Sequence, residues 1–369
     1  MISNKDEPIR VAIVVAQFVT GGIKSYIMNY YRNIDRTKIQ LDFLVNNTSD
    51  NDYQEIYNLG GRVYEITPAI KNPIKNIIDT YKILKKNNYK IVHGLTNALN
   101  VFPMFAAWLA HTPIRISENL STAHPLEKKK TLVKNILRQF STWFPTQLVA
   151  NSELAAKWLF GEKKCLILRN GIDLDKYKYN EKLRNNTRRT LGLTDEFVIG
   201  HIGRFDFQKN HDFLVDVFME VHKIEPKSRL LLVGYGNLKE IIYKKINNLG
   251  LKDSVIDCGA TEDIAKLYNA MDCFVLPSFY EGLPVVGIEA QANGLPCVFS
   301  SEVTTETKVN NSVSFIDLSS DIHEWVDRII SYRGIRDIDQ KNLERAGYDI
   351  RIEAQKLLLL YKHAYDCLK

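Results

Sequence analysis

Residues 11–31 read VAIVVAQFVTGGIKSYIMNYY. The opening run, residues 11–15, is apolar and rich in valine and isoleucine, as expected of a strand that is buried on both faces of a sheet. Gly21 and Gly22 indicate a turn, and residues 23–31 follow as a helix-length stretch. A buried strand, a glycine turn and a helix in this order are typical of the start of a doubly wound α/β domain.

The same alternation of strands and helices continues through the first half of the chain. Further strands are expected at residues 41–45, 63–66, 91–93, 148–150 and 166–168, and helices around 73–87, 98–110 and 152–160. This pattern predicts one doubly wound domain over residues 1–172.

Residues 175–186 are polar and lack apolar periodicity, and they are expected to be a linker or a surface excursion. After them the pattern of strands and helices begins again. Strands are expected at residues 197–203, 230–233, 255–258, 273–276 and 296–299, with a last strand signal at 314–316. Residues 173–349 are therefore predicted to form a second doubly wound domain. Residues 350–369 are predicted to form an amphipathic helix that crosses back to the first domain.

Length and composition agree with two globular α/β domains. A chain of 369 residues exceeds the usual size of one hydrophobic core, and 45% hydrophobic with 25% charged residues is an ordinary globular composition. Five cysteines, an odd number with no C-x-x-C pair, favour a reducing, cytoplasmic location. Residues 1–10 lack a signal peptide, and no window reaches about 18 consecutive apolar residues, so neither secretion nor membrane insertion is expected.

The net charge of +6 suits anionic small molecules or an anionic lipid surface. No arginine-rich tail supports nucleic-acid binding. Ligands of open α/β sheets bind beyond the carboxyl ends of the strands, so the residues that follow strands are the first candidates for a site.

Two cations follow the predicted strand at 197–203. The segment Gly203-Arg204-Phe-Asp-Phe-Gln-Lys209 places Arg204 and Lys209 in a loop that opens a helix. Helix amides and basic side chains both favour anions such as a diphosphate. By spacing alone, two solvated surface charges are the more frequent arrangement.

Two carboxylates lie eight positions apart in the segment Glu281-Gly-Leu-Pro-Val-Val-Gly-Ile-Glu289. Glu281 is expected in a loop after a strand, and Glu289 two turns into the next helix. A carboxylate there can accept two hydrogen bonds from a vicinal diol such as ribose. The alternative is a surface acid, but the apolar neighbours of Glu289 leave little polar face, and a buried acid requires a partner.

The segment E-G-L-P-V-V-G-I-E-A-Q-A-N-G-L-P, residues 281–296, resembles the E-x7-E signature of the family-four, GT-B fold glycosyltransferases. The G-R-x4-K spacing, the segment Leu168-Arg-Asn170-Gly-Ile-Asp173 and the Gly21-Gly22 loop are similar to the same family. These motifs cover nearly the whole chain and follow one another in the same order as in the family. The resemblance implies two Rossmann-like domains facing across a cleft, with residues 1–172 as the acceptor-binding domain. It is nearest to bacterial exopolysaccharide, capsule and O-antigen enzymes.

The resemblance implies a retaining transfer of a sugar from a nucleotide diphosphate, by family habit a UDP-sugar, without a protein nucleophile. Arg204 and Lys209 would bind the diphosphate and stabilise charge on the departing nucleotide, and Glu281 would contact the donor sugar. Glu289 would hold the ribose. The remaining donor contacts that it implies are Gly22, Gly203, Gly259, Gly282, Leu283 and Pro284.

One part of the first domain departs from the family pattern. Relatives commonly carry a histidine in the region where this chain has Glu118, with His124 close behind, so Glu118 and Asn170 are kept as candidate sugar or acceptor contacts. His124 is equally well a surface residue. His93, where relatives often have H-x-H, is interpreted as a strand-end residue that lines the cleft.

No metal and no cofactor are expected, although two D-x-D pairs occur. Asp173 and Asp175 belong to a turn and linker, and Asp337 and Asp339 to a polar helix start, where aspartate favours capping. Because basic residues already supply counter-charge for a diphosphate, these pairs are not needed as metal ligands.

Residues 128–144 predict a basic amphipathic helix. Its apolar residues Leu132, Val133, Ile136, Leu137, Phe140, Trp143 and Phe144 recur at helical spacing, and Lys128, Lys130, Lys134 and Arg138 lie on another face. A helix that covers its own sheet with a solvated basic face is an equal alternative. The resemblance implies a saccharide acceptor, possibly carried on a polyprenyl diphosphate, which makes contact with the inner face of the cytoplasmic membrane a hypothesis.

Two other functions remain open. Tandem doubly wound domains also occur in nicotinamide-dependent enzymes, but the candidate fingerprint at Gly234-Tyr-Gly236 lacks the third glycine of G-x-G-x-x-G. The changed region at Glu118 leaves open a nucleotide-sugar-binding protein that has lost turnover.

Overall fold

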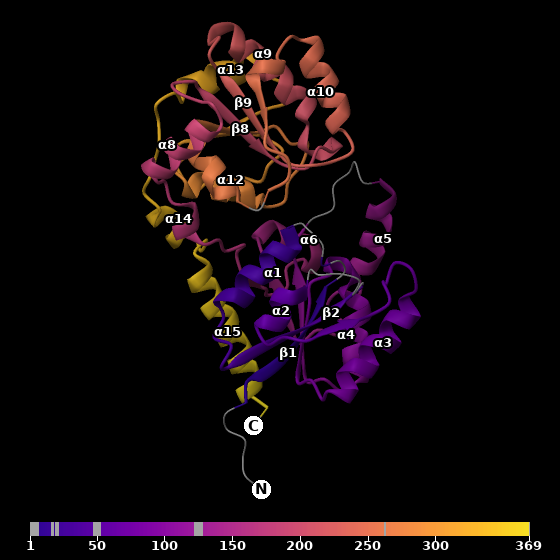
Figure 1. The fold of residues 1–369 in the computed structure, drawn as a ribbon. Helices are drawn as coiled ribbons and strands as arrows, with labels where there is room; N and C mark the ends of the chain where they lie inside the picture. Colours follow the sequence, from indigo (N-terminus) through magenta and orange to yellow (C-terminus); the bar gives the residue numbers. More distant parts are fainter. Residues whose placement is uncertain are drawn as a thin grey trace. The chain divides into compact units, whose positions relative to one another are not determined.

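The chain folds into two compact units, shown in a computed structural model (Figure 1). One unit comprises Met1–Gly171 and Asp349–Lys369, and the other comprises Ile172–Tyr348. We call them the first and the second unit. The structure describes residues 7–15, 18, 22–46, 53–121, 128–261 and 263–368, with only the backbone at 128–131.

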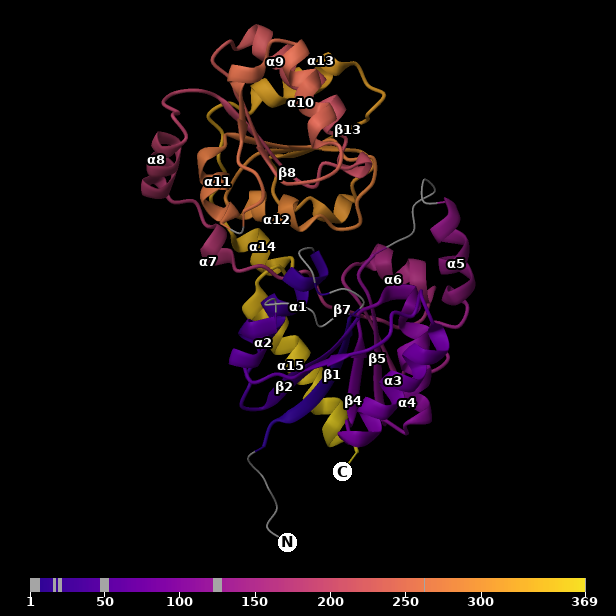
Figure 2. The same ribbon diagram turned by 45° about the vertical axis from the view of Figure 1, so that its right-hand side comes forward.

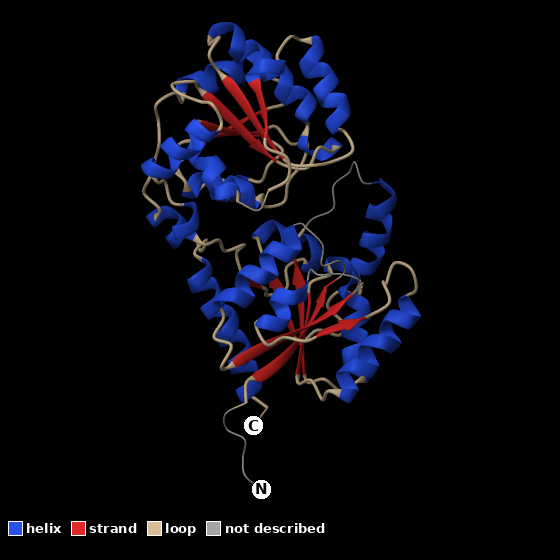
Figure 3. Ribbon diagram, in the orientation of Figure 1, coloured by secondary structure: helices blue, strands red, loops and turns tan. Residues whose placement is uncertain are grey.

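In the described part of the first unit, seven parallel strands form one sheet in the order β3-β2-β1-β4-β5-β6-β7. The strands are β1 (Ile9–Val15), β2 (Ile39–Val45), β3 (Val63–Glu65), β4 (Ile91–Gly94), β5 (Ile114–Asn119), β6 (Gln147–Ala150) and β7 (Leu166–Ile167). The β1 run pairs in register with β2, from Ile9 opposite Ile39 to Val15 opposite Val45. Helices cover both faces of this sheet (Figure 3), which explains why its central strands are unbroken apolar runs.

The helices of the first unit are α1 (Gly22–Asn33), α2 (Gln54–Asn58), α3 (Pro73–Lys86), α4 (Val101–Leu109), α5 (Lys128–Arg138), α6 (Glu153–Phe160) and α15 (Ile350–Asp366), with the 3-10 helix η2 (Asn97–Asn100). Side chains set several of their starts: Asn72 accepts a hydrogen bond from the Lys75 amide at α3, and Ser152 accepts one from the Ala155 amide at α6. The last helix, α15, packs beside α1 (Figure 2), which confirms the predicted return to the first domain.

The second unit holds a six-stranded parallel sheet in the order β10-β9-β8-β11-β12-β13. Its strands are β8 (Val198–Ile202), β9 (Arg229–Val233), β10 (Val255–Asp257), β11 (Cys273–Leu276), β12 (Cys297–Ser300) and β13 (Val313–Ile316). From β8 the chain adds β9 and β10 on one side of β8, and then β11, β12 and β13 on the other side, so the strand order switches at β8. A ligand site is expected at such a switch point, beyond the carboxyl ends of the strands.

The helices of the second unit are α7 (Leu174–Tyr177), α8 (Glu181–Thr190), α9 (His211–Ile224), α10 (Lys239–Asn248), α11 (Ile264–Ala270), α12 (Val285–Ala292), α13 (Ile322–Ser331) and α14 (Lys341–Arg345). Short 3-10 helices are η3 (Phe207–Lys209), η4 (Lys252–Ser254) and η5 (Thr305–Thr307). The doubly wound α/β class is thus confirmed for both units.

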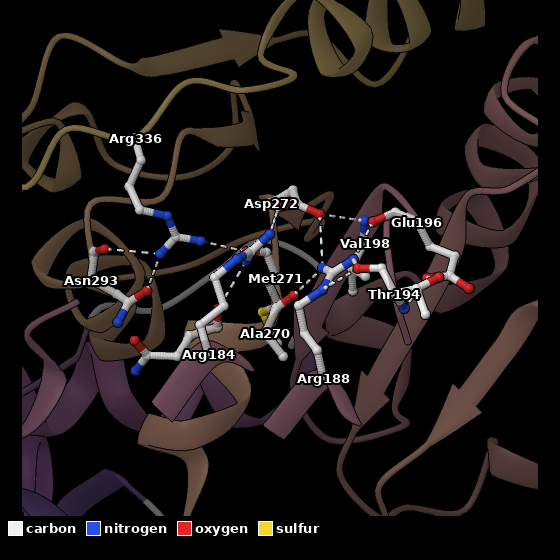
Figure 4. A network of polar contacts seen from close by, with 11 residues as sticks. Arg184, Arg188, Thr194, Glu196, Val198, Ala270, Met271, Asp272, Asn293 and Arg336 are labelled. Atoms are coloured by element: carbon white, nitrogen blue, oxygen red, sulfur yellow. Dashed lines mark hydrogen bonds and ion pairs between the residues drawn. The ribbon is translucent and has the colours of Figure 1, made fainter. Parts of the chain in front are cut away.

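Residues 175–186, expected to be a linker or a surface excursion, contain α7 and most of the first two turns of α8, so the segment is largely helical. Asn180 accepts a hydrogen bond from the Leu183 amide and starts α8. The helix shows little apolar periodicity because it is anchored by arginines: Arg184 and Arg188 bond to the end of α11 and to Asp272 (Figure 4).

Candidate functional site

The loops that follow β8, β9 and β10 touch at the carboxyl end of the second sheet. Glycines permit this contact: Gly234 has φ +149°, and a Cβ on it would lie 2.0 Å from the Gly203 carbonyl oxygen. Gly236 has φ +150°, and its Cβ would lie 2.4 Å from the Phe205 oxygen. The Gly234 amide in turn donates to the Gly259 carbonyl at 2.8 Å. The G-Y-G segment therefore has a packing reason for its glycines, independent of any dinucleotide.

Lys209 and Glu281 meet in this region. Lys209 ends η3, which Asp206 begins by accepting a hydrogen bond from the Lys209 amide. Asn210 follows in the left-handed conformation, with φ +53°, and turns the chain into α9. The Lys209 ammonium lies 2.5 Å from Glu281 Oε1, and their side chains are 15% and 9% exposed. Sequence reasoning chose both residues, and the structure brings them into one shielded ion pair.

The Glu281 carboxylate is held on both oxygens. Ser278 Oγ donates to Oε1 at 2.9 Å, and Gln208 Nε2 donates to Oε2 at 3.2 Å. The backbone of Glu281 also forms an isolated parallel bridge with Val303. The orientation of this carboxylate is therefore fixed before any ligand arrives, which is a condition for precise recognition of a sugar hydroxyl.

Gln208 links the loop after β8 to the loop after β11. Its backbone oxygen accepts from the Phe279 amide at 2.9 Å, and its Nε2 donates to the Tyr280 oxygen at 2.9 Å. The rings of Phe207 and Phe279 stack beside this link, with centroids 4.6 Å apart and planes at 15°. Sequence reasoning missed Gln208, because an uncharged side chain between two motif residues carries no signal of its own.

Arg204 does not join the Lys209–Glu281 pair. Its guanidinium pairs with Asp206 at 3.1 Å, and 63% of its side chain is exposed. The charge stands at the surface of the same loop that carries Lys209, where it has room to reorient toward an anion.

Glu289 is buried in α12, but protein groups satisfy it. Tyr268 Oη donates to Glu289 Oε2 at 2.9 Å, and Tyr177 also hydrogen-bonds to the carboxylate. Burial raises the pKa of Glu289, and the two tyrosine hydrogen bonds act in the opposite direction. The expectation that this buried acid has a partner is confirmed, and Tyr177 and Tyr268 supply partners from within the protein. The ribose contact stays a prediction, and a ribose would have to share the carboxylate with these hydroxyls.

The other predicted donor residues of the second unit lie at the same end of the sheet. Gly282 has open space where a Cβ would point, Leu283 is buried, and Pro284 directly precedes α12. Gly259 has φ +60°, and its amide donates to Asp257 Oδ1 at 2.9 Å. Gly203 packs on the Lys209 side chain, since a Cβ on it would lie 3.1 Å from Lys209 Cδ.

Two buried histidines lie beneath the loop that carries Lys209. His201 Nδ1 donates to the Val275 oxygen at 2.8 Å, and the His211 ring stacks on Phe205 with centroids 4.1 Å apart. Burial, above all, lowers the pKa of His201 to about 4 and that of His211 to about 2. Both rings are therefore neutral near pH 7 and add no charge to that of Lys209 and Arg204.

Glu118 of the first unit is fully enclosed in a polar network. Its Oε2 lies 2.8 Å from His93 Nε2, its Oε1 accepts from Tyr26 Oη, and His93 Nδ1 contacts Tyr361 Oη at 2.7 Å. His93 is 0% exposed, so the expectation that it lines a cleft is wrong: Glu118 and α15 enclose its ring. Glu118 is 1% exposed, and a sugar contact by it remains a prediction that would require this network to open.

The remaining candidates of the first unit are Asn170 and Gly22. Asn170 is half-buried and its Oδ1 accepts from Asn151 Nδ2 at 3.3 Å. Gly22 is the first residue of α1 and is exposed, with open space around the position of a Cβ. Gly21 and His124 lie outside the described residues.

The D-x-D pairs take part in local backbone turns. Asp173 accepts from the Lys176 amide at 3.2 Å and begins α7, and Asp339 accepts from the Lys341 amide at 3.0 Å next to α14. Within the described ranges, His, Cys, Asp and Glu side chains do not gather in a group of three or more that could hold a metal ion.

Sequence comparisons cover both units. The family model described as "Glycosyl transferases group 1" matches residues 184–348, and the model "Glycosyltransferase Family 4" matches residues 20–176. Putative glycosyltransferase EpsF of Bacillus subtilis is 32% identical over 95% of this chain and 96% of its own length. The UDP-Gal:α-D-GlcNAc-diphosphoundecaprenol α-1,3-galactosyltransferase of Escherichia coli is 28% identical over 78% of this chain and 79% of its own.

Solved structures share the arrangement of both sheets. Anabaena HepE, in complex with UDP and glucose, matches with a TM-score of 0.79 at 17% identity, over 96% of this chain and all of that chain. WaaG, a glycosyltransferase involved in lipopolysaccharide biosynthesis, matches with a TM-score of 0.71 at 13% identity, over 95% of this chain and 99% of its own. The fold is therefore common to chains of very different sequence.

Proposed function

The chain belongs to the family-four glycosyltransferases of GT-B fold, and we propose that it transfers a hexose or N-acetylhexosamine from a UDP-sugar to a saccharide acceptor, with retention of the anomeric configuration. The observation that carries this proposal is the Lys209–Glu281 pair. It lies where the loops after β8 and β11 meet, at the switch point of the second sheet.

In this proposal the second unit binds the donor. Lys209 and Arg204 bind the diphosphate, Glu281 contacts a hydroxyl of the donor sugar, and Glu289 contacts the ribose. The backbone around Gly203, Gly259, Gly282, Leu283 and Pro284 completes the donor site. The Lys209 ammonium, which already neutralises the Glu281 carboxylate, would be shared with the phosphate oxygens. The ion pair therefore determines how much positive charge the site offers to the diphosphate.

The reaction needs no protein nucleophile. The acceptor hydroxyl oxygen attacks the anomeric carbon from the face that the diphosphate leaves. The bond between that carbon and the phosphate oxygen breaks, and a phosphate oxygen takes the hydroxyl proton. Negative charge grows on the departing UDP, and Lys209 and Arg204 would stabilise it most at this stage. No metal or cofactor enters this scheme.

Relatives support a lipid-linked acceptor in surface polysaccharide synthesis. The Escherichia coli relative is named for a diphosphoundecaprenol acceptor, and so is an N-acetylgalactosaminyltransferase of Campylobacter jejuni that is 27% identical over 84% of this chain. We therefore propose a polyprenyl-diphosphate-linked acceptor, reached from the inner face of the cytoplasmic membrane. None of the helices in the described ranges is both long and apolar enough to cross a bilayer.

The α5 region provides one candidate contact with the membrane. Leu132, Val133, Ile136 and Trp143 are 52–66% exposed, whereas Leu137 packs against α6 residues. A helix that packs one half-buried apolar residue against its own domain and exposes three others does more than cover that domain. This exposure supports peripheral binding by residues 128–144.

We expect the full-length protein to transfer sugar from a UDP-sugar, rather than from GDP- or ADP-sugars, and to keep its rate in EDTA. The test is a donor screen against a synthetic polyprenyl-diphosphate saccharide, with the anomeric configuration of the product read by NMR. Loss of activity in EDTA that Mn²⁺ or Mg²⁺ restores would contradict the metal-independent scheme, and an inverted product would exclude retention. Tight donor binding with neither transfer nor donor hydrolysis would identify a protein that has lost turnover.

We expect Gln208→Ala to lower kcat/KM for the donor about tenfold, because the Glu281 carboxylate loses one of its donors and its fixed orientation. Gln208→Glu places a second carboxylate against Oε2 of Glu281, so it should lower kcat/KM at least as much as Gln208→Ala does. The matched control is Gln54→Ala, which removes an exposed glutamine hydrogen bond in α2. A lower melting temperature for Gln208→Ala with unchanged kcat/KM would show that Gln208 only supports the fold.

A further inference from the structure

Over the first turns of helix α3, polar side chains are buried and large apolar ones are exposed, whereas Leu84 in its last turn is buried. Asn76 and Thr80 are 3% and 0% exposed, and Asn76 Nδ2 donates to the Thr67 oxygen at 2.7 Å. On the solvent side, Ile74 is 71% exposed and Ile78 is 43% exposed. Single exposed apolar residues are ordinary, but a run of large ones on one helix face marks an interaction surface.

The exposed run is longer than the helix itself. Ile70, in the turn before α3, is 82% exposed, and Tyr81, one turn after Ile78, is 37% exposed. Ile74 and Ile78 are four positions apart and therefore lie one above the other on the same face. Together Ile70, Ile74, Ile78 and Tyr81 form what we call the α3 stripe.

Basic side chains surround the α3 stripe. Residues 70–86 contain five lysines and a single acidic residue, Asp79. All five lysines are exposed: Lys71, Lys75, Lys82, Lys85 and Lys86. Asp79 is turned to the protein, where it accepts hydrogen bonds from the amide and the hydroxyl of Thr67 at 3.0 and 2.7 Å. The surface is therefore both apolar and strongly positive.

The neighbouring helix α4 continues this character. It packs along α3 on the same side of the sheet, and its end exposes Trp108 at 50% and Leu109 at 40% (Figures 1 and 2). The Trp108 ring stacks on Phe105 at 5.8 Å and contacts Phe144 at 5.8 Å, so it is held by packing although half of it is exposed. Tryptophan prefers surfaces where an apolar and a polar medium meet.

We propose that the α3 stripe, with Trp108 and Leu109, is a docking surface for an anionic lipid bilayer. The isoleucines enter the boundary between headgroups and acyl chains, and the lysines contact lipid phosphates. A second copy of this chain is the poorer occupant, because a symmetric contact would bring the same lysines face to face. The surface itself follows from the first unit alone, and its use for reaching a lipid-linked acceptor rests on the proposed function.

The test is flotation of the full-length protein with vesicles of phosphatidylglycerol and phosphatidylcholine in equal parts, and with phosphatidylcholine alone. We expect binding to the anionic vesicles that weakens with salt, and at least a ~10-fold loss of binding for the double variant Ile74→Ser/Ile78→Ser. The matched control is Ile352→Ser/Leu359→Ser, which removes two residues of similar exposure, 47% and 55%, from the outer side of α15. This control should float like the unchanged protein.

Three outcomes would overturn the proposal: no flotation of the unchanged protein at low salt, flotation of the α3 double variant at the unchanged level, or a dimer in light scattering that the same variant converts to a monomer. If Leu132→Ser/Ile136→Ser lost flotation while the α3 double variant kept it, α5, the contact proposed above, would account for docking alone and the α3 stripe would be excluded. Transfer to a soluble acceptor separates this proposal from the enzymatic one. The α3 double variant should transfer sugar to a soluble acceptor at the unchanged rate. If the enzymatic proposal fails, the unchanged protein will not transfer sugar to that acceptor either.

Discussion

Replacing Lys209 by alanine is expected to lower kcat/KM by about 100- to 1000-fold, as removal of a group that stabilises charge in a transition state does. In the proposed reaction, negative charge accumulates on the departing UDP, and Lys209 is the shielded cation of this site, with 15% of its side chain exposed. Its low exposure makes its charge more effective than that of Arg204, which is 63% exposed. The measurement is steady-state transfer from the UDP-sugar, together with the thermal melting of the variant.

A double-mutant cycle with Glu281→Gln decides what Lys209 does. The lysine could serve only to neutralise Glu281, and then the double variant Lys209→Ala/Glu281→Gln should recover activity relative to Lys209→Ala. A lysine that acts on the diphosphate gives no such recovery, which is the result we expect. Lys223→Ala removes an ion pair with Glu220 from the same unit and serves as the control. Equal losses in Lys223→Ala and Lys209→Ala would contradict a role for Lys209 in transfer.

The sequence was sufficient for the fold class because buried parallel strands are unbroken apolar runs. The runs that begin at Val11 and at Phe197 are the centres of the two sheets, and both were recognisable without any partner. The same logic placed Lys209 and Glu281 after strands, at the edge where ligands of such sheets bind.

Residues with polar structural roles were not recognisable in this way. Gln208 and Tyr268 act through hydrogen bonds to residues that are distant in sequence, and helix α8 is anchored by arginines instead of apolar side chains. Hydrophobic periodicity reports which face of an element is buried only when that face is apolar. Helix α3 is an exception of the opposite kind, because its apolar residues Ile74 and Ile78 are exposed to solvent. The spacing of these two residues would therefore assign the wrong face as buried.

The largest loss of stability is expected from Asp272, which is the shared carboxylate of the arginine network at the amino ends of β8 and β11 (Figure 4). Asp272 pairs with Arg184 at 2.5 Å and with Arg188 at 3.3 Å, and it also accepts from the Val198 amide at 2.8 Å. Burial lowers the pKa of the nearby Arg336 to about 10, and the charge of Arg184 acts in the same direction. These guanidinium groups are thus costly to bury, and Asp272 offsets that cost.

We expect Asp272→Ala to lower the free energy of unfolding of the second unit by about 3–5 kcal/mol, because it leaves buried guanidinium groups without their counter-charge. Urea unfolding followed by tryptophan fluorescence provides the measurement, since Trp325 is buried in the second unit. Asp195→Ala is the matched control: its ion pair with Lys227 is 3.2 Å long and exposed on both sides, so its loss should leave the unfolding midpoint nearly unchanged. If the two variants were equally stable, Arg184 and Arg188 of α8 would be held by backbone carbonyls alone. A much larger loss for Asp272→Ala than for Asp195→Ala would instead show that the Asp272 carboxylate holds α8, a helix without an apolar face, next to the sheet.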